Sequence, residues 1–416
     1  MPRKAKKSNR GLRVLAVILT VILCLEGLYC FLVFTEIPII KRYRNAYIGT
    51  ALSTMTHRWL AEALLPEYMV RNVALQQYYT NQKNIDNVSD RPTVPSEDNS
   101  ASDNSATAEA TEPSESPTAA DEDSFYELFW ELSRTSFEDY LDEHPDTLKN
   151  GWNNIYINEA GIDDDGTSIY TTMGEQVLAI DAANKVLLVR VQGTGYIGVL
   201  AVCKDPSQLR CHASQGLATA AYGQSLEDLV EDAGAVIGIT GSGFIDPSGN
   251  GNGGTIAGWA MCGGDNFGSH YTDTAYKRIE LTRDNKMYIT NAYSDVASDV
   301  TDAVEFAPAL VVDGVSYVTN GVYDSYGIQP RAAIGQSATG EILMLIIEGR
   351  QITRSIGASI EDCGNTLMRH NAYTALNLDG GTSAVMWYRG EYVTKCSNTA
   401  ISSRLLPNAW VYGNYN

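Results

Sequence analysis

The stretch from residue 371 to residue 393 holds the residues best suited to chemistry. It reads NAYTALNLDGGTSAVMWYRGEYV, so an apolar run ends at Asp379 and is followed by Gly380 and Gly381. A carboxylate at the end of a buried strand is held by a stiff element, and paired glycines let a ligand approach the backbone closely. An Asp-Gly pair is also the usual sequence of a hairpin turn. The segment alone leaves both interpretations open.

Other polar residues with suitable chemistry also stand beside predicted strands. The motif PRAAIGQ contains Arg331 and precedes a predicted strand at residues 342–347. That strand leads directly into Glu348, with Arg350 following after one glycine. Because Glu348 and Asp379 each follow a predicted strand, we expect both carboxylates to open onto the same edge of one sheet.

Two further motifs complete a recognisable set. The run GAVIGITGSGFID ends at Asp246 and precedes a glycine-rich loop, and the last part of the chain contains Arg404. In this order and spacing the motifs resemble those of the phosphodiester glycosidase family. The family pattern runs Asn-Gly-Gly-Phe-Phe-Asp, Pro-Arg-Thr-Ala-Ile-Gly, Val-Asp-Gly-Arg and Asn-Leu-Asp-Gly-Gly-Gly-Ser. The resemblance covers about residues 225–414.

The chain differs from the family pattern at three positions. Thr240 stands where the pattern has Asn, Glu348 where it has Asp, and Thr382 where it has a third Gly. The motifs that set the fold are kept, so the resemblance still implies the family's fold. The three differences bear on the substrate and the activity.

The resemblance implies hydrolysis of a sugar that is joined through its anomeric carbon to a phosphodiester. Phosphate is already a good leaving group, so the reaction needs little general-acid help. It does need a carboxylate at the anomeric carbon and cations at the phosphate. We predict Asp379 as the first candidate for this carboxylate and Glu348 as the second. A hairpin turn residue is the alternative role for Glu348, and the sequence leaves both open.

The predicted binding residues follow from the same implied reaction. Arg331 and Arg350 are candidates for the phosphate, because a guanidinium group donates two parallel hydrogen bonds to it. A structural ion pair is the alternative role for either arginine in an acidic domain. The other residues predicted to contact the substrate are Gly380, Gly381, Ser383 and Asp246.

The sequence gives little reason to expect a metal or cofactor. His212, His270 and His370 are scattered singly, and no Cys-x-x-Cys pair is present. We therefore expect no metal ion and no cofactor, and a metal-dependent phosphodiesterase is the weaker enzymatic alternative. The non-enzymatic alternative is a membrane-tethered carbohydrate-binding or scaffold module for envelope polysaccharide assembly. Release of free sugar from a sugar-1-phosphodiester would separate the two functions.

The N-terminus indicates a membrane anchor. Basic residues at positions 3–13 precede residues 14–34, a span of 21 residues with one charge, Glu26. At about 1.5 Å per residue this span covers roughly 30 Å, the thickness of a bilayer core. The positive-inside rule places the basic N-terminus in the cytoplasm and the rest of the chain outside it. We therefore predict a single-pass protein of the cell membrane with an extracellular domain.

The charge of the exported part limits its partners. Residues 35–416 hold 24 basic and 49 acidic residues. A domain this acidic is a poor general binder of nucleic acid or anionic lipid. We expect no nucleic acid partner, and we expect instead a phosphorylated glycan or sugar phosphodiester of the cell envelope or of an exopolysaccharide. Binding its phosphate requires local positive charge from individual arginines.

Changes of composition divide the chain into five segments. Residues 1–35 are the basic tail and anchor, and residues 36–83 have the helical spacing of a membrane-proximal stalk of one or two helices. Residues 84–123 are acidic and lack large apolar side chains, which predicts a disordered linker. Residues 124–224 are predicted to be strand-rich, and residues 225–416 are the phosphodiester glycosidase-like domain. The predicted fold class is α+β, with mixed, strand-rich sheets and a few packed helices.

Several elements can be predicted individually. Short apolar runs bounded by Gly, Asn and Asp predict strands, among them residues 168–172 and residues 375–378. Ser225 is followed by Asp228 in a capping-box arrangement, which predicts a helix over residues 226–233. A second helix is predicted around residues 359–369.

Overall fold

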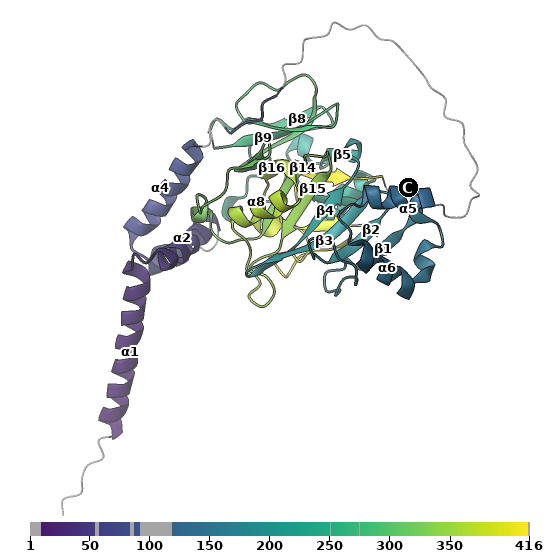
Figure 1. The fold of residues 1–416 in the computed structure, drawn as a ribbon. Coiled ribbons are helices and arrows are strands. Elements are labelled where there is room, and N and C mark those ends of the chain that lie inside the picture. Colours follow the sequence, from purple (N-terminus) through teal and green to yellow (C-terminus); the bar gives the residue numbers. More distant parts are fainter. Residues whose placement is uncertain are drawn as a thin grey trace, which may run out of the picture.

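The chain folds into helices and antiparallel sheets, which confirms the predicted α+β class (Figure 1). The structure is a computed structural model, and in the residues that it describes it has eight α-helices and three sheets. The described residues are 10–54, 58–83, 87–91, 119–249, 251–273 and 275–414.

The first helix, α1 (Arg10–Phe34), is the predicted membrane segment. Within the described ranges it is the one helix long and apolar enough to cross a membrane, over Gly11–Phe34. It extends away from the rest of the molecule in Figure 1, and nearly all of its large apolar side chains are exposed. Its length and composition suit a membrane anchor, and they suit a signal sequence equally.

Three helices follow α1 where the sequence predicted one or two. They are α2 (Pro38–Ser53), α3 (Arg58–Leu64) and α4 (Glu67–Lys83). Pro38 at the start of α2 and Pro66 just before α4 both suit a first helical turn, where a missing N–H costs nothing. These three helices are called the stalk below. They have their own small apolar core, which includes Ile48, Ala61 and Val73.

Part of the predicted linker packs on the body of the molecule. Residues 84–86 and 92–118 lie outside the described residues, whereas residues 87–91 are described. The Ser89 N–H donates to the carbonyl of Ile289 over 2.7 Å, and the Ile289 N–H donates to Ser89 Oγ over 2.9 Å. Arg91 forms ion pairs with Glu280 and Asp299. This short segment therefore holds the chain after the stalk against the body.

The sheets and the remaining helices have the following bounds. The nine-stranded sheet has the spatial order β1 (Tyr156–Asn158), β2 (Val177–Asp181), β3 (Val186–Gly193), β4 (Tyr196–Cys203), β15 (Ile342–Ile347), β14 (Arg331–Ser337), β16 (Ala372–Asn377), β12 (Ala309–Val312) and β13 (Val315–Ser316). A five-stranded sheet has the order β10 (Met287–Asn291), β9 (Lys277–Thr282), β11 (Val300–Phe306), β7 (Trp259–Cys262) and β8 (Asp265–Gly268). The other five-stranded sheet has the order β18 (Glu391–Tyr392), β17 (Met386–Tyr388), β6 (Ile237–Thr240), β19 (Asn408–Tyr412) and β5 (Leu209–Ala213). The helices are α5 (Ala119–Leu128), α6 (Arg134–Glu143), α7 (Leu226–Asp232) and α8 (Ile360–Arg369).

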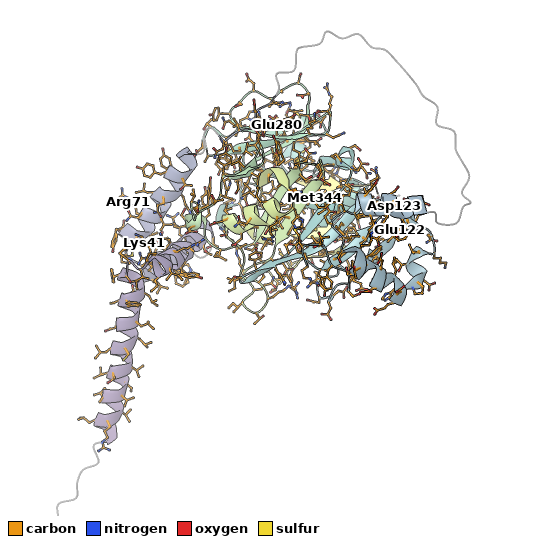
Figure 2. All side chains as sticks on the ribbon, in the orientation of Figure 1. Lys41, Arg71, Glu122, Asp123, Glu280 and Met344 are labelled. Atoms are coloured by element: carbon orange, nitrogen blue, oxygen red, sulfur yellow. The ribbon has the colours of Figure 1, made fainter. Side chains whose placement is uncertain are left out.

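The nine-stranded sheet is buried on both faces, and this explains the unbroken apolar run of β15. Met344 and Ile346 belong to the core cluster shared with the two smaller sheets. Leu343 and Leu345 point the other way, into the cluster that includes side chains of α5, α6 and α8. Successive residues of a strand face opposite sides, so a strand covered on both faces must be apolar throughout. Met344 lies inside the body in Figure 2.

The helix predictions and most strand predictions are confirmed. Ser225 Oγ accepts a hydrogen bond from the Asp228 N–H at the start of α7, and Ser359 caps α8 in the same way. Residues 168–172 form only isolated bridges rather than a strand, so that prediction is wrong. The PRAAIGQ motif does not merely precede a strand but is one, β14, whose small residues gave it little apolar signal.

Candidate active site

Strand order brings the ends of three central strands to one edge of the nine-stranded sheet. β14 lies between β15 and β16 and is antiparallel to both, so β15 and β16 run parallel to each other. Glu348 follows β15, and Asp379 follows β16 after one further residue. Arg331 begins β14 and pairs with Ile347, so it lies at the same edge. The three residues predicted from separate motifs are therefore neighbours in the sheet.

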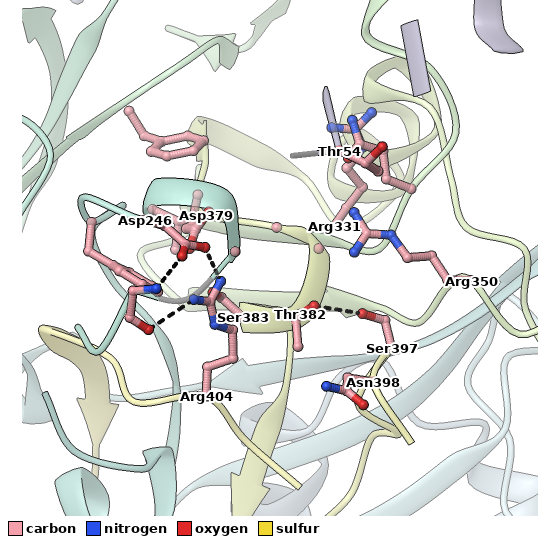
Figure 3. A pocket seen from close by; sticks show the side chains of 18 of the residues that line it. Thr54, Asp246, Arg331, Arg350, Asp379, Thr382, Ser383, Ser397, Asn398 and Arg404 are labelled. Carbon is pink, nitrogen blue, oxygen red and sulfur yellow. Dashed lines mark hydrogen bonds and ion pairs between the residues drawn. The ribbon is translucent and has the colours of Figure 1, made fainter. Parts of the chain in front are cut away.

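A cavity of about 1080 Å³ opens at this edge. Figure 3 shows it from close by. All but one of the residues predicted as catalytic or substrate-binding line it, namely Asp246, Arg331, Arg350, Asp379, Gly380, Gly381 and Ser383. The exception is Glu348, which is not among the lining residues.

Asp379 lines the cavity near Asp246, Arg350 and Arg404. Its side chain is half-buried at the end of β16 and forms a hydrogen bond with Ser383. Burial raises the pKa of Asp379 to about 6, and the neighbouring Asp246 carboxylate adds to this rise. The Ser383 hydrogen bond and the positive charges of Arg404 and Arg350 act in the opposite direction. The carboxyl is therefore poised to be ionised at neutral pH yet readily protonated.

The two glycines after Asp379 allow the cavity wall to pack closely. A Cβ atom on Gly380 would lie 2.6 Å from the carbonyl oxygen of Pro330, which is closer than real Cβ atoms come. Gly381 has a φ of +61°, and a Cβ there would lie 3.2 Å from Arg350 Nη2. Any side chain at these positions would push the turn off the strand end or displace Arg350.

Arg404 and Asp246 close the glycine-rich loop over the cavity. Arg404 Nη1 and Asp246 Oδ2 form an ion pair of 2.5 Å, and Arg404 Nη2 donates to the Gly251 carbonyl over 3.1 Å. The Gly251 N–H in turn donates to Asp246 Oδ1. Burial pushes the pKa of Asp246 upward, but the hydrogen bonds from Arg404 and Gly251 outweigh it and hold the pKa below its ordinary value. Two carboxyls of the same cavity thus differ in proton affinity, an arrangement typical of acid–base sites.

The two predicted phosphate arginines are in different environments. Arg331 is buried, and its guanidinium donates to the carbonyl oxygens of Ala358, Tyr326 and Gly327 over 3.1, 3.1 and 2.8 Å. This burial lowers the pKa of Arg331 to about 10. Arg350 is an exposed residue, and its guanidinium has no hydrogen bond or ion pair with any other described residue, although partial burial in the cavity lowers its pKa. Of the two, Arg350 has its donors available for a phosphate.

Glu348 is held by other partners. Its side chain is 2% exposed, and both carboxylate oxygens accept hydrogen bonds from Arg354. The Lys395 N–H donates to Glu348 Oε1 over 2.9 Å. Glu348 thus lies at the predicted edge of the sheet, but its carboxylate forms an ion pair with Arg354 and does not line the cavity.

Some lining residues were missed in the sequence. Arg404 was noted only as part of a motif, because a single arginine in a loop carries no signal until β19 and β6 bring it beside Asp246. Asn377 lines the cavity and has a buried Oδ1 with no hydrogen-bond partner among the described residues. Thr54 and Gln77 reach the cavity from the stalk.

In the part of the chain that the structure describes, no group of three or more His, Cys, Asp or Glu side chains is arranged to hold a metal ion.

Comparison with known families and structures identifies the C-terminal part. Residues 233–412, less than half of the chain, match the family model described as phosphodiester glycosidase. A comparison with curated proteins found no match.

Three solved structures are similar to this chain over slightly more than half of its length. The zebrafish N-acetylglucosamine-1-phosphodiester alpha-N-acetylglucosaminidase catalytic domain, auto-inhibited by its pro-peptide, is 14% identical, with 55% of this chain and 82% of that chain covered and a TM-score of 0.45. A hypothetical protein from Synechocystis is 13% identical, with 57% and 63% covered and a TM-score of 0.39. A putative exported protein from Burkholderia pseudomallei is 15% identical, with 52% and 74% covered and a TM-score of 0.40.

Proposed function

Because residues 233–412 form a domain of the phosphodiester glycosidase family, we propose a specific activity for the whole chain. In this proposal the protein is a membrane-anchored, extracytoplasmic hydrolase. It cleaves the glycosidic C–O bond of a sugar-1-phosphodiester in an envelope or exopolysaccharide glycan. The observation that carries this proposal is the cavity wall, where the Asp379 carboxyl lies among Arg350, Arg404 and the Gly380-Gly381 turn.

In the proposed reaction, Asp379 works in its ionised form at the anomeric carbon. The bond between that carbon and the phosphate oxygen breaks, and its electron pair leaves with the phosphate. Positive charge develops on the sugar, and a carboxylate beside it stabilises that charge or takes a proton from the attacking water. With a pKa of about 6, Asp379 is mostly ionised at pH 7 and can also accept the water's proton.

The leaving phosphate is assigned to Arg350. Its guanidinium lies beside the Gly381 turn and lines the same cavity as Asp379, so it is within reach of a group bound next to Asp379. Arginine suits this task because its planar fork matches two phosphate oxygens. Arg331 instead acts as a positioning residue, since its donors hold the backbone at Tyr326, Gly327 and Ala358.

Asp246, Arg404 and Ser383 complete the sugar side of the site. Asp246 and Arg404 hold the glycine-rich loop closed, so that its backbone can approach the sugar. Ser383 sets the orientation of the Asp379 carboxylate by hydrogen bonding to it. Glu348 is assigned a structural role, as the partner of Arg354.

The proposed cellular setting rests on α1. A helix of this length preceded by basic residues favours an anchor with the C-terminal domain outside the cytoplasm. Two reporter enzymes can be fused after residue 416, one that works only after export and one that works only in the cytoplasm. We expect only the first to be active. Activity of a reporter that works only in the cytoplasm would contradict this orientation.

A direct assay tests the proposed activity. The purified full-length protein in detergent is given the methyl phosphodiesters of several sugar-1-phosphates, in both anomeric forms, in water enriched in ¹⁸O. We expect free sugar with the label at C1 and unlabelled methyl phosphate, because the C–O bond breaks. Asp379→Asn protein is the control for contaminating hydrolases.

Two other results would overturn the proposal. Label in the phosphate would mean that the P–O bond breaks, as in a phosphodiesterase. Saturable sugar phosphodiester binding without any hydrolysis would favour the carbohydrate-binding or scaffold module. The raised pKa of Asp379 inside a cavity favours catalysis over that alternative, because strongly perturbed carboxyl pKa values are concentrated at catalytic sites.

A further inference from the structure

The wall of the cavity is completed by the stalk. Thr54, at the end of α2, and Gln77, in α4, both line the cavity of the glycosidase domain. These residues precede residues 233–412, the part that matches the family model, by more than 150 positions. The site is therefore composite, with one wall supplied by a segment outside the matched domain.

The stalk is fixed to the domain by polar contacts. Gln77 Nε2 donates to the Ser325 carbonyl over 2.5 Å, and the Ile328 N–H donates to Thr50 Oγ1 over 2.9 Å. Arg42 Nε lies 3.1 Å from an Asp324 oxygen. A Cβ on Gly49 would meet the Ser325 carbonyl oxygen at 1.9 Å, so the helix and this loop pack with no space between them. The stalk wall thus has a defined position relative to the cavity.

The two sides of the cavity carry different groups. In Figure 3, Asp246, Asp379 and Arg404 gather on one side, whereas Thr54 lies on the other side, with Arg331 and Arg350. A sugar with its anomeric carbon at Asp379 and its phosphate at Arg350 would extend the second phosphate ester toward the stalk. The volume of about 1080 Å³ is slightly above the range of about 300–1,000 Å³ that is common for ligand sites. There is room for more than a sugar phosphate.

We propose that Thr54 and Gln77 form the aglycone subsite, and that the aglycone bound there is a hydroxyl-rich unit, a second sugar or a polyol. This inference rests on the proposed function. The lining next to the stalk includes polar groups, because Tyr326 follows Ser325, the partner of Gln77, and Gln329 Nε2 donates to the Tyr326 carbonyl over 2.8 Å. Gln77 donates through its amide nitrogen to Ser325, which leaves its amide oxygen to accept from a hydroxyl group of the substrate.

The test compares two substrates that share the sugar-1-phosphate cleaved fastest in the methyl phosphodiester assay. One is its methyl phosphodiester, and the other is its phosphodiester with the 6-hydroxyl of methyl glucoside. The measured quantity is the ratio of kcat/KM for the glucoside diester to kcat/KM for the methyl diester, using full-length protein. Gln77→Ala is expected to lower this ratio about fivefold, the loss of one hydrogen bond of ordinary strength. Thr54→Val, which keeps the side-chain shape, should lower it in the same direction.

Gln76→Ala is the matched control, because Gln76 is the neighbouring glutamine of α4 but is exposed and does not line the cavity. It should leave the ratio as in the parent. Melting temperatures of the variants check that the stalk remains docked. An unchanged ratio in both Gln77→Ala and Thr54→Val overturns the subsite while leaving the proposed function intact. A ratio that rises in them overturns it too, because the stalk would then obstruct the aglycone. A parent protein that cleaves no sugar-1-phosphodiester overturns the proposed function and the subsite together.

Discussion

The ends of β15 and β16 make an instructive comparison. Both strands run in the same direction in one sheet, with only β14 between them, and each is followed by a carboxylate. Glu348, after β15, is 2% exposed and bound on both oxygens by Arg354. Asp379, after β16, lines the cavity and has a raised pKa.

The difference shows that position at a sheet edge does not by itself give a carboxylate a chemical role. Hydrogen bonds from Arg354 and from the Lys395 backbone N–H satisfy the carboxylate oxygens of Glu348, so this residue stabilises the loop. Partial burial beside Asp246 makes the charged form of Asp379 less favourable, so it keeps reactivity. We expect changes at the two residues to have opposite effects on activity and on stability.

The largest expected effect is the loss of activity in Asp379→Asn. The amide keeps the shape but cannot carry the negative charge, so kcat/KM should fall more than a hundredfold, about 3 kcal/mol of transition-state stabilisation. Hydrolysis of the best methyl phosphodiester measures it. A variant within a fewfold of the parent would remove Asp379 from catalysis.

The same variant should be more resistant to heat than the parent at pH 7.5. The pKa of Asp379 is raised in the folded protein, so the folded state favours the protonated form and loses stability as pH rises through about 6. Removing the charge removes this loss. The difference in melting temperature should shrink as the pH falls and vanish below about pH 3, where the carboxyl is protonated in both the folded and unfolded chain.

Glu348→Gln should show the converse pattern. It leaves Arg354 without its carboxylate partner, which should lower the free energy of unfolding by about 2 kcal/mol, less than for a fully buried pair because Arg354 is 26% exposed. Urea unfolding gives this value. We expect kcat/KM of the folded protein to stay within a fewfold of the parent, and a hundredfold loss in well-folded protein would restore Glu348 as a catalytic candidate.

The two arginines extend the comparison to the phosphate. Arg350→Lys should raise KM about tenfold, because the point charge remains but one of two parallel hydrogen bonds is lost. Its melting temperature should match the parent's. Arg331→Lys should instead lower stability by about 1–2 kcal/mol, since one ammonium cannot reproduce the fork that joins three carbonyl oxygens. Exchanged outcomes for the two variants would assign the phosphate to Arg331.

The smallest expected effect is on pH dependence. If ionised Asp379 is required, kcat/KM should rise with pH through about 6 and then level off. Asp246→Asn removes a neighbouring negative charge and frees Arg404, and both changes favour the ionised form of Asp379. The rising limb should therefore move to lower pH in the activity that remains. A limb that moves to higher pH would contradict this electrostatic coupling.

Local patterns in the sequence predicted much of the fold. The run at residues 342–347 reproduces β15 residue for residue, because a strand buried on both faces must be apolar throughout. β14 was missed because its alanines and glycine carry little apolar signal, although a glycine is required where Gly335 meets the Thr374 carbonyl.

The sequence could predict the proximity of site residues only where they belong to the same motif. Asp379, Gly380 and Gly381 follow one another in sequence, so their proximity is guaranteed. The pairing of Glu348 with Arg354 depends on a tight turn that the sequence did not reveal, and Arg404 meets Asp246 across 158 positions. Thr54 and Gln77 reach the cavity through docking of a separate helical segment, which no local pattern specifies.

The most direct test of the central claim is chemical rescue at the two strand ends. Asp379→Ala and Glu348→Ala proteins are assayed on the same sugar-1-phosphodiester with and without sodium formate, which can place a small carboxylate in the space left by the side chain. We predict that Asp379→Ala is inactive alone and recovers hydrolysis at least tenfold with formate, while Glu348→Ala does not respond to it. An Asp379→Ala protein that formate leaves inactive, beside a Glu348→Ala protein whose hydrolysis formate restores, would contradict the account and move the reaction centre to the end of β15.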